Sequence, residues 1–130
     1  MLGHSTPFGS FSTDSAARAL EFYRDALGLD ATLDETMGQM VWLHHPHGGE
    51  TLIYEKPDHV PASHTVLMFR VDDVETLAVA LRGAGVTLEA MDFSDDDGVA
   101  RDPEGRMPST LWFKDPAGNW LSAMQAEGGS

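Results

Sequence analysis

Residues 40–54, MVWLHHPHGGETLIY, and residues 110–124, TLWFKDPAGNWLSAM, decide the fold, because both stretches carry the same pattern. In each, an apolar run is followed by a turn rich in Pro and Gly and then by a second apolar run, which predicts a β-hairpin. The positions that recur are Trp42 with Trp112, Pro46 with Pro116, and Gly48 with Gly118. A repeat of about half the chain predicts two copies of one supersecondary module.

A strand-like stretch and an amphipathic helix precede each hairpin. In the first copy we expect Ser12 or Asp14 to cap a helix that begins near Ser15 and stops at Gly28. Its apolar stripe consists of Ala16, Leu20, Tyr23 and Leu27. In the second copy the corresponding residues are Asp72 or Asp73 at the start, Val74, Leu77, Ala78 and Leu81 along one face, and Gly85 at the end.

The two copies predict an α+β fold of two βαβββ modules within one domain. We expect this domain to span residues 1–130, with module one at about 8–56, a linker at 57–63 and module two at about 64–125. Two prolines stiffen the linker, and residues 127–130 are expected to fray.

The composition argues against several classes of partner. A formal net charge of −13 disfavours nucleic acid and anionic membrane surfaces, both of which attract basic proteins. The chain has no cysteine, which excludes disulfides and thiolate metal sites. The first residues carry no signal-peptide pattern, and no later run is long enough to span a bilayer, so we expect a soluble cytoplasmic protein.

Alternation along the predicted strands separates a smooth face from a mixed one. In residues 40–44 and 110–114 the aliphatic side chains alternate with Trp and polar groups. The smooth face suits packing on a helix, whereas the mixed face is typical of the wall of a small-molecule cleft. The equally weighted alternative is that these are ordinary sheet residues with no ligand. The predicted ligand-binding residues are Trp42, Tyr54, His64, Trp112, Trp120, Ser122 and Met124.

Three motifs make the chain resemble the vicinal oxygen chelate superfamily, which includes glyoxalase I, bleomycin and fosfomycin resistance proteins and extradiol dioxygenases. They are FYRDALGL at 22–29, VDD at 71–73 and FKDPAGN at 113–119. The resemblance runs from about Phe8 to Gln125, and it implies that the modules curl into a cup-shaped mixed sheet that holds the ligand. Many members place His and Glu ligands to a divalent metal in the first and last strands of each module.

The positions at which the family carries metal ligands hold other residues here. They are Ser122 in the last strand of module two, Leu52 or Thr51 in that of module one, Pro7 or Phe8 in the first strand, and Val66 before the second helix. Only His64, two residues from Val66, offers an imidazole. Because a divalent ion needs several convergent oxygen or nitrogen ligands, we expect no catalytic metal and no other cofactor.

His64 is the one predicted catalytic residue, as a general base or hydrogen-bond donor at the start of a strand that enters the cup. The equally weighted alternative is a half-exposed residue at a strand end. His44, His45 and His47 crowd one hairpin and are interpreted as an exposed polar turn.

The acidic insertion at 92–106 is where module two exceeds module one. Asp95, Asp97, Gly98 and Glu104 fit positions 3, 5, 6 and 12 of a calcium loop, but Phe93 stands at position 1 where aspartate is needed. We therefore expect a loop that borders the cup, and in the family such segments can act as a lid.

These observations predict a small-molecule-binding protein of the glyoxalase and bleomycin-resistance type. We expect it to hold a small aromatic or amphipathic compound among its aromatic side chains. The alternative is a glyoxalase- or dioxygenase-like enzyme. It would use an unconventional metal site, or His64 as acid and base beside a carboxylate such as Glu50 or Glu55. A homodimer fits either alternative, because family members often pair and two-fold pairing is the commonest assembly.

Overall fold

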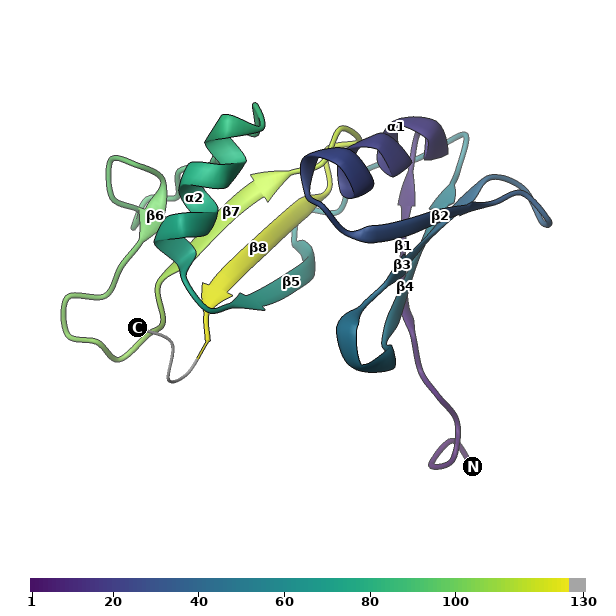
Figure 1. The fold of residues 1–130 in the computed structure, drawn as a ribbon, viewed down its shortest axis with the longest axis horizontal. Helices are drawn as coiled ribbons and strands as arrows, with labels where there is room; N and C mark the ends of the chain where they lie inside the picture. The colour runs from purple at the N-terminus through teal and green to yellow at the C-terminus, as the bar shows by residue number, and fades with distance from the viewer. Residues whose placement is uncertain (127–130) are drawn as a thin grey trace. The chain divides into compact units, whose positions relative to one another are not determined.

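The computed structural model describes residues 1–126, so the fraying expected at 127–130 lies outside the described residues. Contacts divide the chain into two compact units, Met1–Val60 and Pro61–Ser130, and each unit contains one four-stranded mixed sheet with a helix (Figure 1). The predicted α+β fold of two βαβββ modules is therefore confirmed. That the two units form one domain and one cup stays a prediction. Within residues 1–126, no helix combines the length and the apolar character that crossing a membrane requires.

The first unit places its first strand beside its last. Its elements are β1 (Gly9–Thr13), α1 (Ala16–Glu21), a π-helical turn (Phe22–Ala26), β2 (Asp30–Asp34), β3 (Met40–His44), a 3₁₀ turn (Pro46–Gly48) and β4 (Glu50–Glu55). The strand order is β1-β4-β3-β2, with β1 parallel to β4 and the other pairs antiparallel.

The second unit repeats this topology. Its elements are β5 (Thr65–Val71), α2 (Val74–Gly83), β6 (Val99–Ala100), β7 (Thr110–Lys114) and β8 (Trp120–Gln125). The strand order is β5-β8-β7-β6, with β5 parallel to β8 and the other pairs antiparallel. β6 has only two residues and lies within the acidic insertion at 92–106, so this insertion supplies the edge strand of the sheet.

The start of the first helix differs from its prediction. Ser15 is the N-cap and accepts the Arg18 N–H at 3.3 Å, so the expectation of Ser12 or Asp14 is wrong. Ser12 lies inside β1, and its hydroxyl lies 2.6 Å from Nδ1 of His59. In the second helix, the prediction of Asp73 as N-cap is confirmed, because its carboxylate accepts the N–H groups of Glu75 and Thr76.

The same hydrogen bond joins helix to sheet in both units. The Ala16 N–H at the start of α1 donates to Glu55 Oε1 at the end of β4, over 2.9 Å. The Val74 N–H at the start of α2 donates to Gln125 Oε1 at the end of β8, also over 2.9 Å. The first N–H groups of a helix lack partners within the helix, so each last strand satisfies one of them.

One face of each sheet packs on the helix of its own unit (Figure 1). α1 lies on β2, β3 and β4, and α2 lies on β7 and β8. The buried sheet residues on these faces include Val41, Leu43 and Ile53 in the first unit and Leu111, Phe113 and Leu121 in the second. The prediction that the smooth aliphatic face packs on a helix is confirmed. The opposite face of each sheet, called its open face below, carries the mixed residues.

Candidate functional site

The open face of the first sheet is centred on Trp42. In the strand register Trp42 lies between Thr32 of β2 and Leu52 of β4. The ring of Phe8 packs on it with centroids 5.2 Å apart, and the indole N–H donates to Asp34 Oδ2 over 3.2 Å. The N–H and hydroxyl of Thr36, followed by this indole N–H, lower the pKa of Asp34. Trp42 is therefore held in a fixed orientation with part of its ring exposed.

Tyr54 is the second predicted ligand residue of this face. It lies opposite Met40 in the β3–β4 ladder, and its side chain is exposed. Trp42 and Tyr54 thus come from adjacent strands and share one face of the sheet.

The open face of the second sheet is centred on Trp112. Phe93 from the acidic insertion meets it edge to face, with ring centroids 5.5 Å apart. Ser122 lies directly opposite Trp112 and is fully buried, and its hydroxyl donates to the carbonyl of Leu111 over 2.9 Å. The Ser122 hydrogen is thus already engaged, which leaves its oxygen as an acceptor.

Trp120 and Met124 lie on either side of Ser122 along β8. Lys114 Nζ lies 4.6 Å from the centre of the Trp120 ring, a cation–π contact that covers part of this ring. Met124 is half-buried opposite Thr110 of β7. Trp112, Trp120, Ser122 and Met124 therefore share the open face, and of these Trp112 alone lines the cavity described next.

A cavity of about 420 Å³ lies on this face, beneath the acidic insertion. Its lining residues are Phe93, Ala100, Arg101, Asp102, Pro103, Met107, Pro108, Thr110 and Trp112. The carboxylate of Asp102 accepts the N–H groups of Glu104, Arg106 and Met107 at 2.9–3.1 Å, which shapes the turn that forms one side of the cavity. This volume lies within the range of small-molecule sites and suits a compact aromatic compound.

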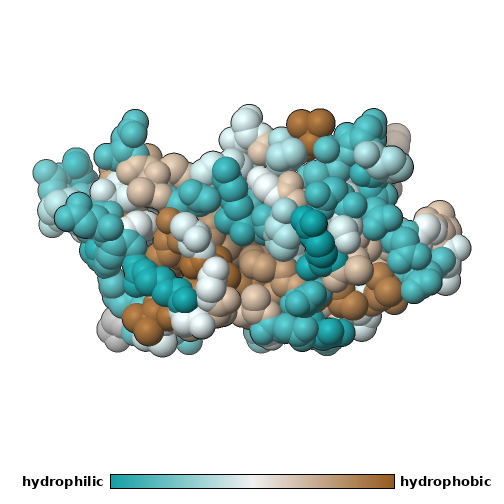
Figure 2. Space-filling model, turned by 90° about the horizontal axis from the view of Figure 1, so that it is seen from above, coloured by the Kyte–Doolittle hydropathy of each residue, from teal (hydrophilic) through white to brown (hydrophobic). Residues whose placement is uncertain are grey.

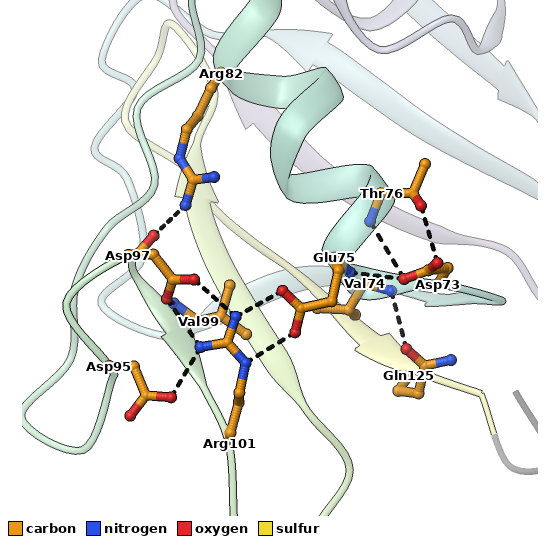
Figure 3. Close-up of polar contacts among 10 residues, drawn as sticks. All are labelled: Asp73, Val74, Glu75, Thr76, Arg82, Asp95, Asp97, Val99, Arg101 and Gln125. Atoms are coloured by element: carbon orange, nitrogen blue, oxygen red, sulfur yellow. Dashed lines mark hydrogen bonds and ion pairs between the residues drawn. The ribbon is translucent and has the colours of Figure 1, made fainter. Parts of the chain in front are cut away.

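Arg101 organises the other side of the insertion (Figure 3). It donates to both carboxylate oxygens of Glu75 in α2 at 2.6 and 2.8 Å, and to both of Asp97 at 2.7 and 3.0 Å. A further bond joins it to Asp95 at 2.8 Å. These bonds raise the pKa of Arg101, and they hold the pKa of Asp97 at about 2. The insertion is thereby fastened to the start of α2.

The same contacts account for the residues that resemble a calcium loop. Asp95 and Asp97 face the Arg101 guanidinium, and Glu104 pairs with Arg106 at 2.5 Å. A cation within the chain thus already lies among these carboxylates, which supports the expectation of a loop that borders the site.

The residues at the family's metal positions do not fit a divalent ion. Pro7 and Phe8 precede β1, and the ladder pairs Ser10 with Leu52 and Met68 with Ser122. None of these side chains is a carboxylate or an imidazole, the ligand types that such a metal requires. Within residues 1–126, no group of three or more His, Asp or Glu side chains is placed to hold a metal.

His64 is exposed and lies one residue before β5. The two carboxylates considered as its partners have other roles. Glu55 accepts the Ala16 N–H, and Glu50 lies 3.1 Å from His44 Nδ1. His64 thus has no carboxylate partner among the ion pairs of the described residues, and its catalytic role stays a prediction.

Sequence reasoning missed a polar chain on the open face of the first sheet. His44 lies opposite Glu50 in the β3–β4 ladder, and its Nε2 lies 3.0 Å from the Thr32 hydroxyl. A carboxylate can only accept, so the ring donates from Nδ1 to Glu50; in the neutral ring, Nε2 then accepts from the Thr32 hydroxyl. Alternation of the strand residues placed His44 on this face, but only the register reveals its two partners.

Several large apolar side chains are exposed outside the sheet cores. They are Phe8, Met37, Tyr54, Met68, Phe93 and Met107, among others. Figure 2 shows a mainly hydrophilic surface that apolar side chains interrupt in a few places. Phe8 and Phe93 are 55% and 65% exposed although each packs on a tryptophan, so both aromatic pairs remain accessible to a ligand.

Comparison with known proteins identifies the family. Residues 4–123 match the profile of the Glyoxalase/Bleomycin resistance protein/Dioxygenase superfamily. The chain therefore belongs to this superfamily, as the FYRDALGL and FKDPAGN motifs predict. A search of curated proteins found no significant match.

Solved structures with the same fold include proteins of different function. TnmS3, an antibiotic binding protein from Streptomyces sp. CB03234, is 21% identical, with 94% of this chain and 97% of that chain covered and a TM-score of 0.68. Lactoylglutathione lyase from Agrobacterium tumefaciens is 20% identical, with 96% of each chain covered and a TM-score of 0.69. The fosfomycin resistance protein FosX from Listeria monocytogenes is 9% identical, with 93% and 90% covered and a TM-score of 0.71. At these identities the likeness concerns the fold, and function must come from the site.

Proposed function

We propose that this protein binds a compact aromatic molecule without a catalytic metal, on the open face of the second sheet. The observation that carries the proposal is the cavity of about 420 Å³ in which Trp112 and Phe93 form an aromatic wall. A contact between two aromatic rings adds about 0.5–1.5 kcal/mol to the favourable free energy that comes from burying their surface. The antibiotic-binding function of TnmS3, a protein of the same fold, is compatible with this proposal.

The chemistry of the other lining residues limits the classes of ligand that fit the cavity. Met107, Pro103 and Pro108 add apolar surface, Asp102 adds a carboxylate, and Arg101 adds a guanidinium whose N–H groups are bonded to carboxylates of the chain. We infer that the ligand is uncharged or cationic, since an anion would meet this carboxylate and the acidic insertion. The ligand-binding roles predicted for Trp120, Ser122 and Met124 on the same sheet, those predicted for Trp42 and Tyr54 on the first sheet, and a homodimer remain part of the proposal.

The experiment is calorimetric titration with 2-naphthol as the aromatic probe. Wild-type protein should bind it, and Trp112→Ala and Phe93→Ala should each weaken binding by about tenfold, the effect of losing one stacking partner. Val79→Ala is the control, because Val79 is an exposed apolar residue on α2 outside the cavity. Equal affinity of the Trp112→Ala and wild-type proteins would refute the proposal.

Metal dependence is tested in the same titration. The affinity for 2-naphthol should be the same in the presence of EDTA as in the presence of added nickel, zinc, manganese or ferrous ion. The reason is that the positions at which the family carries metal ligands hold no carboxylate or imidazole here. A metal content of about one equivalent, with binding lost in EDTA, would overturn the metal-free part of the proposal.

A second candidate function is acid–base catalysis, and the Thr32–His44–Glu50 chain favours it. Glu50 holds the neutral imidazole with its proton on Nδ1, so that Nε2 can take a proton from a substrate placed on Trp42. Such a base would abstract a proton next to a carbonyl group.

This candidate is tested by deuterium exchange into 2-hydroxyacetophenone, followed by NMR. His44→Gln should abolish exchange above the buffer rate, whereas His45→Gln should retain it. His45 is the matched control, because its Nε2 bonds to Thr51, which is buried on the helix side of the sheet. Wild-type exchange at the buffer rate would eliminate catalysis of this kind.

A further inference from the structure

The cavity has one wall that the sheet does not supply. Phe93 belongs to the irregular segment of residues 92–109, defined here as the acidic flap, and β6 is its only strand. Two ladder pairs, Val99 with Leu111 and Ala100 with Thr110, join this flap to the sheet. The ends of the flap have further backbone bonds to the sheet: the Glu89 N–H, just before the flap, donates to the Trp112 carbonyl, and the Gln125 N–H donates to the Ser109 carbonyl, each over 2.8 Å. Between these ends the two-residue edge strand is a weak anchor, so side-chain contacts must add to it to hold Phe93 against Trp112.

Arg101 supplies those contacts through its whole guanidinium group (Figure 3). Its five hydrogen bonds to Glu75, Asp95 and Asp97 match the five N–H groups that a guanidinium carries. The bonds to Glu75 connect Arg101 to α2, where Glu75 lies 26 residues before Arg101 in the sequence. The bonds to Asp95 and Asp97 stay within the flap. Arg101 therefore joins two separate segments of the fold.

The bond from Arg101 to Asp95 also restrains the position of Phe93. Asp95 lies two residues after Phe93, and its N–H bonds to the carbonyl of Val99 over 2.9 Å. The Ser94 N–H donates to the carbonyl of Met91, and the Met91 N–H donates to the Ser94 hydroxyl, each over 2.9 Å. Phe93 thus lies inside a closed turn whose far end Arg101 holds.

Arg82 adds a second contact between α2 and the flap. It donates to the backbone carbonyl of Asp97 (Figure 3). A helix-side cation and a helix-side carboxylate, Glu75, thus both face the same short stretch of the flap. The Arg101 side chain is 31% exposed, so its ion pairs are partly shielded from water, unlike the 75% exposed Arg106 side chain that pairs with Glu104.

We propose that Arg101 is a positioning residue for the ligand cavity, because it fastens the acidic flap to α2 through Glu75 and so holds Phe93 against Trp112. The proposal rests on the function proposed above, and it adds the residue that sets the affinity of that site. Arg101 binds no anionic group of the ligand, since carboxylates of the chain occupy all of its N–H groups.

The test combines amide hydrogen exchange with the 2-naphthol titration. Arg101→Gln and Glu75→Gln should each raise the exchange rate of peptides from residues 92–109 and weaken 2-naphthol binding about fivefold or more. Arg106→Gln is the matched control, because it removes ion pairs within the same flap, to Glu104 at 2.5 Å and to Asp102 at 4.0 Å, that do not reach α2. It should change neither readout by more than about twofold.

A double-mutant cycle separates positioning from a general loss of charge. If Arg101 acts through Glu75, the double variant should bind 2-naphthol about as weakly as Arg101→Gln alone. Additive losses would overturn the proposed pathway, as would a flap that remains protected from exchange in Arg101→Gln. Faster exchange with unchanged affinity would overturn the role in binding.

The two proposals fail in different ways. Hydrogen exchange needs no ligand, so it tests the fastening of the flap in every case. Failure of the wild-type protein to bind 2-naphthol would refute the proposed function, whereas wild-type binding that Arg101→Gln leaves intact would refute this inference.

Discussion

Asp115→Ala should destabilise the second unit strongly, because Asp115 organises the turn of the FKDPAGN motif. Its side chain is 5% exposed. One carboxylate oxygen accepts the N–H groups of Ala117 and Asn119 at 3.0 and 2.9 Å, and the other accepts the Asn119 side-chain amide at 3.0 Å. The backbone closes the same turn, since the Asp115 N–H donates to the Asn119 carbonyl over 3.0 Å.

The magnitude follows from these three side-chain bonds. Alanine would leave two backbone N–H groups and one amide without this acceptor in buried surroundings. An unsatisfied buried donor costs about 1–3 kcal/mol, and entry of water would recover part of this loss. We therefore expect the free energy of unfolding to fall by about 3–5 kcal/mol, a large part of the stability of a typical domain.

The assay is urea unfolding followed by far-ultraviolet circular dichroism. His45→Ala is the matched control, because His45 starts the equivalent turn of the first unit, and its N–H donates to the Gly49 carbonyl over 2.7 Å. Its side chain makes no hydrogen bond into that turn and instead contacts Thr51. The control should cost about 1 kcal/mol, the worth of one hydrogen bond. A loss below about 1 kcal/mol in Asp115→Ala would refute the reasoning.

Three further predictions concern the flap and the cavity. Calorimetry should show that 2-naphthoate binds at least about tenfold more weakly than 2-naphthol. The reason is that the cavity presents the Asp102 carboxylate to the ligand, while all N–H groups of Arg101 are already bonded to carboxylates of the chain. Equal affinities for the two compounds would contradict this prediction. Gly98→Ala should lower the free energy of unfolding, measured with urea, by about 1–2 kcal/mol, since Gly98 has φ +88° and an added Cβ would lie 2.9 Å from Leu88 Cβ. An unchanged urea concentration at the midpoint of unfolding would contradict this prediction. The pKa of Asp97 is lowered from 3.8 to about 2, first by the Arg101 hydrogen bonds, so its stabilising contribution is present above about pH 4 and is lost as the pH falls towards 2. NMR titration of this carboxyl group should give a midpoint near 2 in the wild type, and a midpoint near 4 would show that Arg101 does not hold it.

Local patterns sufficed to predict the modules. Alternation assigned Val41 and Leu43 to the helix side and Trp42 to the open face, and burial agrees. Prediction failed at the first N-cap, because Ser12, Asp14 and Ser15 are all capping residues, and the position where the strand ends decides among them.

The contacts of the candidate site were beyond sequence reasoning. Phe93 stands in a segment without periodicity, so no local rule pairs it with Trp112. The Arg101–Glu75 pair links residues 26 positions apart, and Thr32 meets His44 only because β2 and β3 pair in one register. Such pairings depend on how elements pack, and a side chain's own neighbours in the sequence do not report them.

The sequence by itself determined the repeated module, the family and the face of each sheet that carries Trp42 or Trp112. Strand alternation, turn residues and helix periodicity are local properties that a linear pattern records directly. Only the tertiary structure decided that Phe93 packs on Trp112 in the wall of a cavity and that Arg101 fastens this flap to Glu75. The physical reason is that ring packing and guanidinium–carboxylate bonds form only when distant segments are brought within a few ångströms, and their geometry arises from packing of the whole unit.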